Sequence, residues 1–429
     1  MDDDITTDQS AHVQLSFFTN DKSLDHLPTT IFDVPTSADC EQINSLVNKS
    51  ISLENESWED KRFEFLIGDV FLRTTLAEFI SEYEFETEVV VKVECVLGLE
   101  APKPLHDYQA PDWVSSVHAA NGFVLSTTYS GDIVVWDKKG QQTTFATKDG
   151  LLKCSVLVKK PGKSMNGSEI IVGSEDQLLT LYTIKDDKLE KQIVFRGHER
   201  SVECVAANSK TQQAISGSYD FSLKLWNTRL DDVSTVYEKE DENDAKLKKR
   251  KKSYLTKIPM VTIGGHKDRI SAVHWSHNNN SHVVSSSWDH TIIEWDLELA
   301  GELSRIRGQK AFTSIDIHPS TGMTISSSTD PLPRLYDLKS RDGSLVKQTF
   351  YGHEKGWVES VKWCPNDEKC FVSVATDKSA KMWDIRSGKT ALFDIHGHEE
   401  RILCCSWSEE GIIATGSADC TVKVFDAKR

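Results

Sequence analysis

Apolar and polar residues follow two different periods between residues 11 and 98. Strict alternation over HVQLSFFT and TTIFDVP is typical of half-buried strands, whereas Ile43, Leu46, Val47 and Ile51 recur at the spacing of one helix face. Apolar runs on both sides of a Gly-Asp pair indicate a hairpin. The predicted elements are two strands at residues 12–19 and 29–35, a helix at 38–51, a hairpin at 63–73, a short helical turn at 74–83 and a last strand at 89–96.

This order of elements within residues 11–98 predicts a small ubiquitin-like β-grasp domain. We expect Asp39 to cap the helix, because Gln42 follows three residues later and completes the pattern of a capping box.

A repeat dominates the chain after residue 112. Each unit has a turn followed by alternating residues that end on an aromatic side chain. The seven terminal aromatics are Trp136, Tyr182, Trp226, Trp295, Tyr336, Trp383 and Phe425, spaced by 46, 44, 69, 41, 47 and 42 residues. This is the period of a four-stranded propeller blade. The pattern resembles WD repeats, so we expect a mainly β protein, a seven-bladed WD40 β-propeller preceded by the β-grasp domain.

Polar residues recur at fixed places in the repeat. A histidine after glycine, a serine, the aspartate of the tight turn and the tryptophan can satisfy one another inside a blade. The complete sets are His198, Ser216, Asp220 and Trp226; His266, Ser285, Asp289 and Trp295; and His353, Ser373, Asp377 and Trp383. A catalytic site would occur once, so recurrence around the ring favours a structural role for these histidines.

Some repeats depart from this pattern. His398 also follows a glycine, but Gln309 stands where a fifth histidine would be. In the first blade Ser130 occupies the turn-aspartate position, and in the second Val172 occupies the serine position. We expect weaker polar networks in these two blades.

The last repeat reaches Phe425 and Asp426 just before the final residue, Arg429, so its outermost strand must come from elsewhere. Residues shortly before Trp113 are expected to supply it and to close the ring. The predicted organisation is a disordered tail at residues 1–10, the β-grasp domain at 11–98, a linker with the ring-closing strand at 99–112 and the propeller at 113–429. Within the propeller, a disordered charged insertion is expected at about 229–258.

The 69-residue spacing contains that insertion. Within it an acidic run is followed by a basic cluster made of Lys246, Lys248, Lys249, Arg250, Lys251 and Lys252. A segment of this composition cannot bury apolar area. The basic cluster suits nuclear import or contact with RNA phosphates, and a solvated loop without a partner is the alternative.

Composition narrows the classes of function. The net charge of −16 argues against a uniformly basic surface for nucleic acid, although a local basic patch stays open. No apolar run is long enough to span a bilayer, and the acidic start MDDDITTDQS does not predict a signal peptide. The nine cysteines include no CxxC pair, so we expect no metal site within this chain and mostly reduced core thiols.

Particular strings point to a family. SFFT at 16–19, FEFLI at 63–67 and FLRTTL at 71–76 resemble the Notchless-like N-terminal domain. Seven blades with a charged insertion after the third, together with DWVSSV at 112–117 and GWVESVKWCP at 356–365, resemble the WD-repeat subunits of the pescadillo complex.

The resemblance implies a non-enzymatic assembly factor for the large (60S) ribosomal subunit and for maturation of precursor rRNA. It implies that the propeller joins pescadillo and the block-of-proliferation WD protein, and that the N-terminal domain docks on the metal-ion-dependent adhesion site of midasin, an AAA ATPase. It further implies contact with pre-60S particles, a location in the nucleus, nucleolus and nucleoplasm, and no cofactor apart from a Mg²⁺ ion held by the partner.

Four glutamates in EYEFETE precede the last strand of the β-grasp domain. Alternation places Val89, Val91, Val93 and Cys95 on the core side, and Glu88, Val90, Lys92 and Glu94 on the exposed side. An adhesion site of this kind leaves one position on its cation for a carboxylate of the partner. The family register assigns that role to Glu88, whereas Glu82, Glu84 and Glu86 are expected to add solubility and negative charge.

Two other classes of function compete with this one. An enzyme lacks support, because the chain has neither a phosphate-binding glycine loop nor a nucleophile and base outside the repeated network. A WD40 adaptor, such as the substrate receptor of a ubiquitin ligase, is the alternative. Direct rRNA contact by the propeller stays open, because repeats can present basic patches that average out in the composition.

Overall fold

The structure is a computed structural model of the chain. It describes residues 11–21, 24, 27–28, 30–85, 89–232, 254–276, 279–338 and 346–428. They form two compact units, and the chain passes from the first to the second between Ala101 and Pro102. In the described part of the chain, no helix combines the length and apolar character needed to cross a membrane.

The first unit is one five-stranded sheet with two helices, and its strand order is β2-β1-β5-β3-β4. Its elements are β1 His12–Phe18, β2 Ile31–Pro35, α1 Cys40–Glu54, β3 Phe63–Ile67, β4 Val70–Phe71, α2 Leu76–Tyr83 and β5 Val91–Leu97. Strand β1 pairs antiparallel with β2 and parallel with β5, which pairs antiparallel with β3. This mixed sheet with a helix between its second and third strands is the predicted β-grasp fold.

Local signals in the sequence account for these elements. The Asp39 side chain accepts from the Gln42 backbone, and the Gln42 side chain accepts from the Asp39 backbone, so the predicted capping box is confirmed. The hairpin turns at Gly68, whose φ of 64° is costly for a residue with a Cβ.

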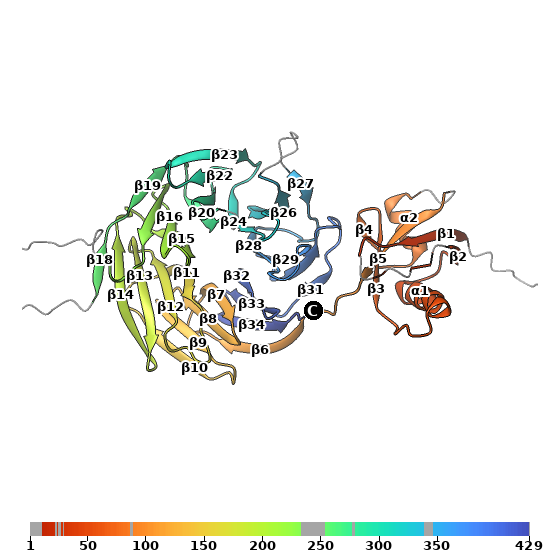
Figure 1. The fold of residues 1–429 in the computed structure, drawn as a ribbon, viewed down its shortest axis with the longest axis horizontal. Helices are drawn as coiled ribbons and strands as arrows, with labels where there is room; N and C mark the ends of the chain where they lie inside the picture. Colours follow the sequence, from red (N-terminus) through yellow and green to blue (C-terminus); the bar gives the residue numbers. More distant parts are fainter. Residues whose placement is uncertain are drawn as a thin grey trace, which may run out of the picture. The chain divides into compact units, whose positions relative to one another are not determined.

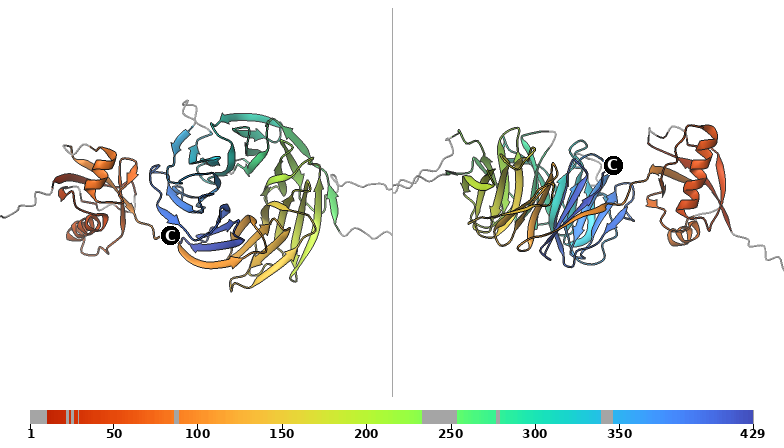
Figure 2. Two further views of the ribbon diagram at one scale, coloured as in Figure 1. Left: turned by 180° about the vertical axis from the view of Figure 1, so that it is seen from behind. Right: turned by 90° about the horizontal axis from the view of Figure 1, so that it is seen from below.

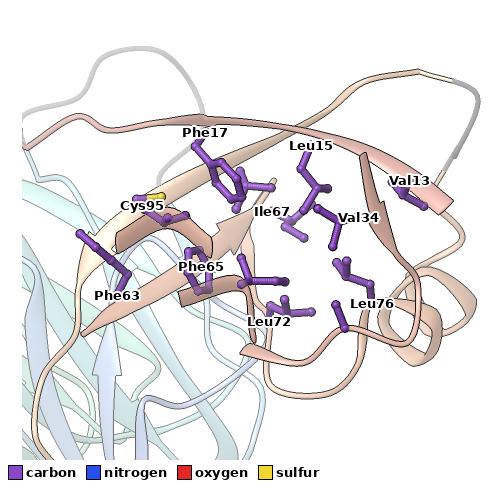
Figure 3. Close-up of a cluster of buried hydrophobic side chains, with 14 of the residues drawn as sticks. Val13, Leu15, Phe17, Val34, Phe63, Phe65, Ile67, Leu72, Leu76 and Cys95 are labelled. Carbon is purple, nitrogen blue, oxygen red and sulfur yellow. The ribbon is translucent and has the colours of Figure 1, made fainter. Parts of the chain in front are cut away.

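One core joins the sheet and the helices of this unit. Figure 3 shows Leu15 and Phe17 of β1, Phe65 of β3 and Cys95 of β5 among the clustered side chains, and all four are almost fully buried. Ile43, Val47 and Ile51 of α1 belong to the same cluster, as their helical spacing predicted.

The second unit contains seven sheets in the described residues, and each is a propeller blade. The first, innermost strands are β7 Val114–Ala120, β11 Leu152–Lys159, β15 Val202–Asn208, β20 Ile270–Trp275, β24 Phe312–Ile317, β28 Val358–Trp363 and β32 Ile402–Trp407. The second strands are β8 Phe123–Thr128, β12 Glu169–Ser174, β16 Gln213–Ser218, β21 His282–Ser287, β25 Thr324–Ser328, β29 Cys370–Ala375 and β33 Ile412–Ser417.

The third and outer strands complete the blades. The third strands are β9 Asp132–Trp136, β13 Leu178–Lys185, β17 Ser222–Asn227, β22 Thr291–Asp296, β26 Asp330–Tyr336, β30 Ala380–Asp384 and β34 Thr421–Asp426. The outer strands are β10 Gln142–Ala146, β14 Lys188–Arg196, β19 Val261–Gly264, β23 Gly301–Arg307, β27 Val346–Thr349, β31 Phe393–Ile395 and β6 Lys103–Gln109. The innermost strands lie around the centre of the ring in Figure 1, and the edge-on view in Figure 2 shows blade strands that run between the two faces of the ring.

Strand β6 closes the ring. It pairs antiparallel with β34, from Asp426 opposite Lys103 to Thr421 opposite Gln109, so the last blade takes its outer strand from residues before Trp113. Tyr108 of β6 also stacks on Trp136 of the first blade, with ring centroids 4.9 Å apart. This is the position that the sequence assigned to the ring-closing strand.

The segment at about 229–258, predicted to be disordered, contains a described strand, whereas its residues 233–253 and the predicted disordered tail at 1–10 lie outside the described residues. Leu255–Lys257, inside the segment expected to be disordered, form β18, which pairs parallel with β14 at the outer edge of the second blade. The side chain of Lys257 is buried and donates a 2.5 Å hydrogen bond to the Arg229 carbonyl oxygen. Charge patterning missed this strand because its pairing partner lies about 60 residues earlier, outside any local window.

Candidate functional site

The histidines predicted to be structural lie in closed hydrogen-bond networks. In the third blade, His198 Nδ1 donates to Asp220 Oδ2 at 2.8 Å, and its Nε2 accepts from Ser216 Oγ at 2.7 Å. Trp226 Nε1 donates to the same Ser216 oxygen at 2.8 Å. The hydrogen-bonding groups of these four side chains are therefore paired and almost excluded from water. The network has a structural role in the blade and leaves no free nucleophile or base.

The fourth and sixth blades repeat this arrangement. His266 pairs with Asp289 and Ser285 at 3.0 and 2.8 Å, and the indole of Trp295 donates to Ser285. The remaining predicted set, His353, Ser373, Asp377 and Trp383, has corresponding distances of 2.7 to 2.8 Å.

A fourth network was not predicted. In the seventh blade His398 pairs with Asp419 at 2.9 Å and with Thr415 at 2.8 Å. Its sequence signal was present in the Gly-His pair and in SADCT, but Phe425 replaces the tryptophan, so the set did not match the full pattern.

The blades that depart from the repeat use other polar groups. The Ser126 hydroxyl of the first blade has no hydrogen-bond partner in the described part of the chain. In the second blade the buried carboxylate of Asp149 accepts from Tyr182 Oη and Lys191 Nζ, both at 2.5 Å. In the fifth blade, where Gln309 replaces the histidine, Arg334 donates to Asp330 at 2.6 Å. Arg334 thus pairs with the turn aspartate of the fifth blade in place of the missing histidine, whereas Tyr182, the terminal aromatic of the second blade, donates to an aspartate instead of a serine.

The networks shift the acidities of their members in opposite ways. Burial by itself would raise the pKa of Asp220, but hydrogen bonds from His198 and Ser222 outweigh it and hold that pKa below its ordinary value. Burial lowers the pKa of His198, and Asp220 offsets only part of this effect. The neutral imidazole and ionised carboxylate therefore persist in the folded state around neutral pH.

Replacing Ser373 with alanine tests the energetic role of a complete network. The change leaves His353 Nε2 and Trp383 Nε1 without their partner in a buried site, so we expect the free energy of unfolding to fall by about 2 kcal/mol. Ser126→Ala removes an unpaired hydroxyl at the equivalent place in the first blade and should cost less than about 0.5 kcal/mol. Equal losses in urea unfolding would contradict the network account.

His118 provides a pH test. Its Nε2 lies 3.0 Å from both the carbonyl oxygen and the hydroxyl of Ser155, and burial lowers the pKa of His118 to about 4. The unfolded chain takes up a proton near pH 6.5 but the folded chain does not, so stability should fall as the pH drops from about 6.5 to 4. His118→Gln should flatten this part of the profile in thermal unfolding, and an unchanged slope would contradict the assignment.

Two predicted site elements lie outside the described residues. These are Glu88, together with Glu86 two residues before it, and the basic cluster Lys246, Lys248, Lys249, Arg250, Lys251 and Lys252. The nearest described neighbour of Glu88 is Val89, and its side chain is 62 % exposed. Glu82 and Glu84, at the end of α2, are also exposed.

The predicted core position of Val89 is wrong. Pairing of β5 with β1 begins at Val91, opposite Leu15, so the pleat that alternates side chains does not extend back to Val89. Val93 and Cys95 do face the core as predicted. Glu94, placed on the exposed side with Glu88, is buried instead. The side chain of Val89 is therefore exposed because this residue lies before the first paired residue of β5. Strand alternation does not account for its exposure.

In the described ranges no group of three or more histidine, cysteine, aspartate or glutamate side chains has the geometry to hold a metal ion. The nine cysteines are all free thiols, and eight of them lie in propeller blades or in strand β5. Burial raises the pKa of thiols such as those of Cys204 and Cys404.

Comparison with protein-family models and curated proteins gives a consistent result. The NLE (NUC135) domain model matches residues 13–80, within the β-grasp unit. The WD domain, G-beta repeat model matches residues 189–227, 257–296, 344–384 and 389–426. The four repeats include the four blades that carry a histidine network.

Relatives resemble the chain along nearly its whole length. A protein of Caenorhabditis briggsae named ribosome biogenesis protein WDR12 homolog is 57 % identical over 99 % of this chain and 98 % of its own. Proteins with the same name from Brugia malayi and Aedes aegypti are 41 % and 34 % identical, over 94 % and 99 % of this chain and 93 % and 97 % of their own.

Proposed function

Because this chain belongs to the family of WDR12-type ribosome biogenesis proteins, we propose that it is a scaffold for assembly of the large ribosomal subunit and for maturation of its precursor rRNA. The family consists of WD-repeat scaffolds and not of enzymes. The observation that carries the proposal is the identity of 57 % over 99 % of the chain, because it spans both the β-grasp unit and the propeller.

The propeller serves as the platform for the other subunits. Its seven blades are tied by the closing strand β6 and by four buried histidine networks, so it offers a rigid surface that needs little ordering on binding. We assign it to binding pescadillo and the block-of-proliferation WD protein on pre-60S particles, the partners implied by the family resemblance.

The β-grasp unit serves as the attachment point for midasin. Glu88 would contribute one carboxylate oxygen to a Mg²⁺ ion held by the partner's adhesion site, and ATP-driven movement of midasin would then release the complex. The exposed side chain of Val89 and the exposed Glu82 and Glu84 support an accessible, negatively charged approach to this position. The chain itself needs no cofactor for this role.

The proposed location is the nucleus, with the nucleolus and nucleoplasm as the sites of action. The basic cluster at 246–252 would serve nuclear import, and contact with rRNA phosphate is a second role for the same charges.

Affinity purification of the tagged chain, followed by identification of its bound proteins and RNA, tests the proposal. We expect pescadillo, the block-of-proliferation WD protein, midasin and precursor rRNA of the large subunit. Recovery of a ubiquitin ligase without pre-ribosomal particles would contradict the proposal and favour a WD40 adaptor.

A further inference from the structure

A β-bulge occurs at the same place in all seven blades. Near the start of each innermost strand the pairing register shifts by one residue, and this leaves one extra residue unpaired. The extra residues are Ser115, Lys153, Glu203, Ser271, Thr313, Glu359 and Leu403. All seven line a central cavity of about 540 Å³. Because a bulge redirects its side chain, these residues form one ring in the channel.

Three members of this ring are charged, Lys153, Glu203 and Glu359, and Lys153 Nζ lies 4.9 Å from the centroid of the Tyr129 ring. Glu203 accepts a 2.7 Å hydrogen bond from Ser201 Oγ and lies 3.9 Å from Arg269 Nη1. Glu359 has neither a hydrogen bond nor an ion pair with any other described residue, and it is partly buried. Burial raises the pKa of Glu359, although Arg401 and Arg269 oppose this shift. A partly desolvated carboxylate without a direct hydrogen bond or ion pair is unfavourable, and a cation from another molecule would satisfy it.

A second set of equivalent positions surrounds the mouth of the channel. In every blade the residue just before the innermost strand accepts a backbone hydrogen bond from the residue just after the second strand. We call these the rim pairs. They are Trp113 and Tyr129, Leu151 and Glu175, Ser201 and Tyr219, Arg269 and Trp288, Ala311 and Thr329, Trp357 and Thr376, and Arg401 and Ala418.

The propeller fold does not require aromatic residues at the rim. Ala311 and Thr329 make the same backbone hydrogen bond with small side chains, at 2.9 Å. Nevertheless Trp113 and Trp357 are each 43 % exposed and Tyr219 is 39 % exposed. Aromatic side chains that the blade does not need, gathered at one end of the channel, indicate a binding surface.

The rim aromatics hold one another and the rim arginines in place. The Arg269 guanidinium lies 3.6 Å above the ring of Trp288, whose centroid is 5.8 Å from that of Trp357. Trp288 of the fourth blade thus contacts Trp357 of the sixth blade, because Ala311 of the fifth blade, which lies between them, is small.

The other side of the mouth is built in the same way. The Arg401 guanidinium lies 5.1 Å from the ring of Trp113, which meets Tyr129 edge-on at 6.2 Å. Tryptophan, tyrosine and arginine dominate binding hot spots, and side chains already fixed by neighbours lose little entropy on binding.

We propose that this rim binds a segment of a partner protein, whose apolar side chains cover Trp113 and Trp357 and whose basic side chain enters the channel toward Glu359 and Glu203. The inference rests on the proposed function, because the partner is taken to be a subunit of the assembly complex. Aromatic and basic side chains can also bind single-stranded RNA. The basic side chains at this mouth already lie against aromatic rings, Lys153 on Tyr129, Arg269 on Trp288 and Arg401 on Trp113. The charged side chain left without a hydrogen bond or ion pair among the described residues is Glu359, which favours a cation over phosphate.

The test uses the full chain and the purified complex of pescadillo with the block-of-proliferation WD protein. Trp113→Ala combined with Trp357→Ala should weaken binding at least about 100-fold. Glu359→Lys should weaken it at least about 10-fold. Leu299→Ala is the matched control, because Leu299 is 77 % exposed and lies beyond the opposite end of β22 from Trp288; its affinity should stay within about 2-fold of wild type. Thermal unfolding verifies that each variant is folded.

The outcomes separate the inference from the proposed function. If the wild-type chain does not bind the complex, the proposed function itself fails. If wild type binds and the double tryptophan variant binds equally well, the rim is not the docking surface. Unchanged binding by folded Glu359→Lys would refute entry of a basic side chain. Binding of a single-stranded RNA oligonucleotide that is lost in the double variant and strengthened by Glu359→Lys would assign the rim to RNA instead.

Discussion

Replacing Glu88 with alanine is expected to reduce binding of this chain to the adhesion site of midasin at least about 100-fold. A Mg²⁺ ion in such a site requires oxygen ligands in near-octahedral geometry, and the substitution replaces the incoming carboxylate by water. Glu88→Asp should also fail, because its oxygen falls about one bond length short of the metal. The measurement is the affinity of the purified full chain for the isolated adhesion domain with Mg²⁺ present.

Glu82→Ala supplies the matched control. Glu82 is an exposed carboxylate at the end of α2, and its loss removes the same charge without removing the proposed ligand. Its affinity should change less than about 3-fold. Binding to the pescadillo complex should be unaffected in both variants, because the rim residues lie in the propeller. A Glu88→Ala chain that still binds the adhesion domain would refute the role of Glu88.

Removing strand β6 is expected to produce the largest loss of stability. A chain that begins at Trp113 leaves the edge of β34 unpaired and loses the Tyr108 ring stacked on Trp136 and the ion pair between Asp107 and Lys423. The unfolding temperature of the propeller should fall by at least about 10 °C, or the product should aggregate through its open edge.

A chain that begins at Pro102 is the control for this truncation. It lacks the same β-grasp unit but keeps β6, so its unfolding temperature should lie within a few degrees of the propeller transition of the full chain. Comparison of the two truncations by calorimetry isolates the strand from the rest of the N-terminal region. Equal stability of the two products would show that β6 does not close the ring.

Most of the fold could be predicted because its signals are local. The capping residues Asp39 and Gln42 and the glycine at 68 each act within a few residues. The repeat was equally clear, since every blade must bury an aromatic at the end of its third strand, as Trp226 and Trp383 do. A buried polar network also constrains residue type and spacing together, so its members were identifiable in three blades.

The remaining features depend on contacts between distant segments. Strand β18 forms only because β14 offers an edge, and the burial of Lys257 depends on the Arg229 carbonyl. Val89 is exposed because the ladder of β5 starts two residues later. The rim pairs have no common residue type, so only the structure aligns Trp113 with Trp357 and Ala311.

The most direct test of the account is the level of large ribosomal subunits after depletion of this chain. Sucrose-gradient profiles and pulse-labelled rRNA would be measured in depleted cells that express either the wild-type chain or the Glu88→Ala variant. The account predicts loss of free 60S subunits with accumulation of their precursor rRNA, rescued by wild type and not by Glu88→Ala. Normal 60S levels and normal rRNA maturation in the depleted cells would contradict it.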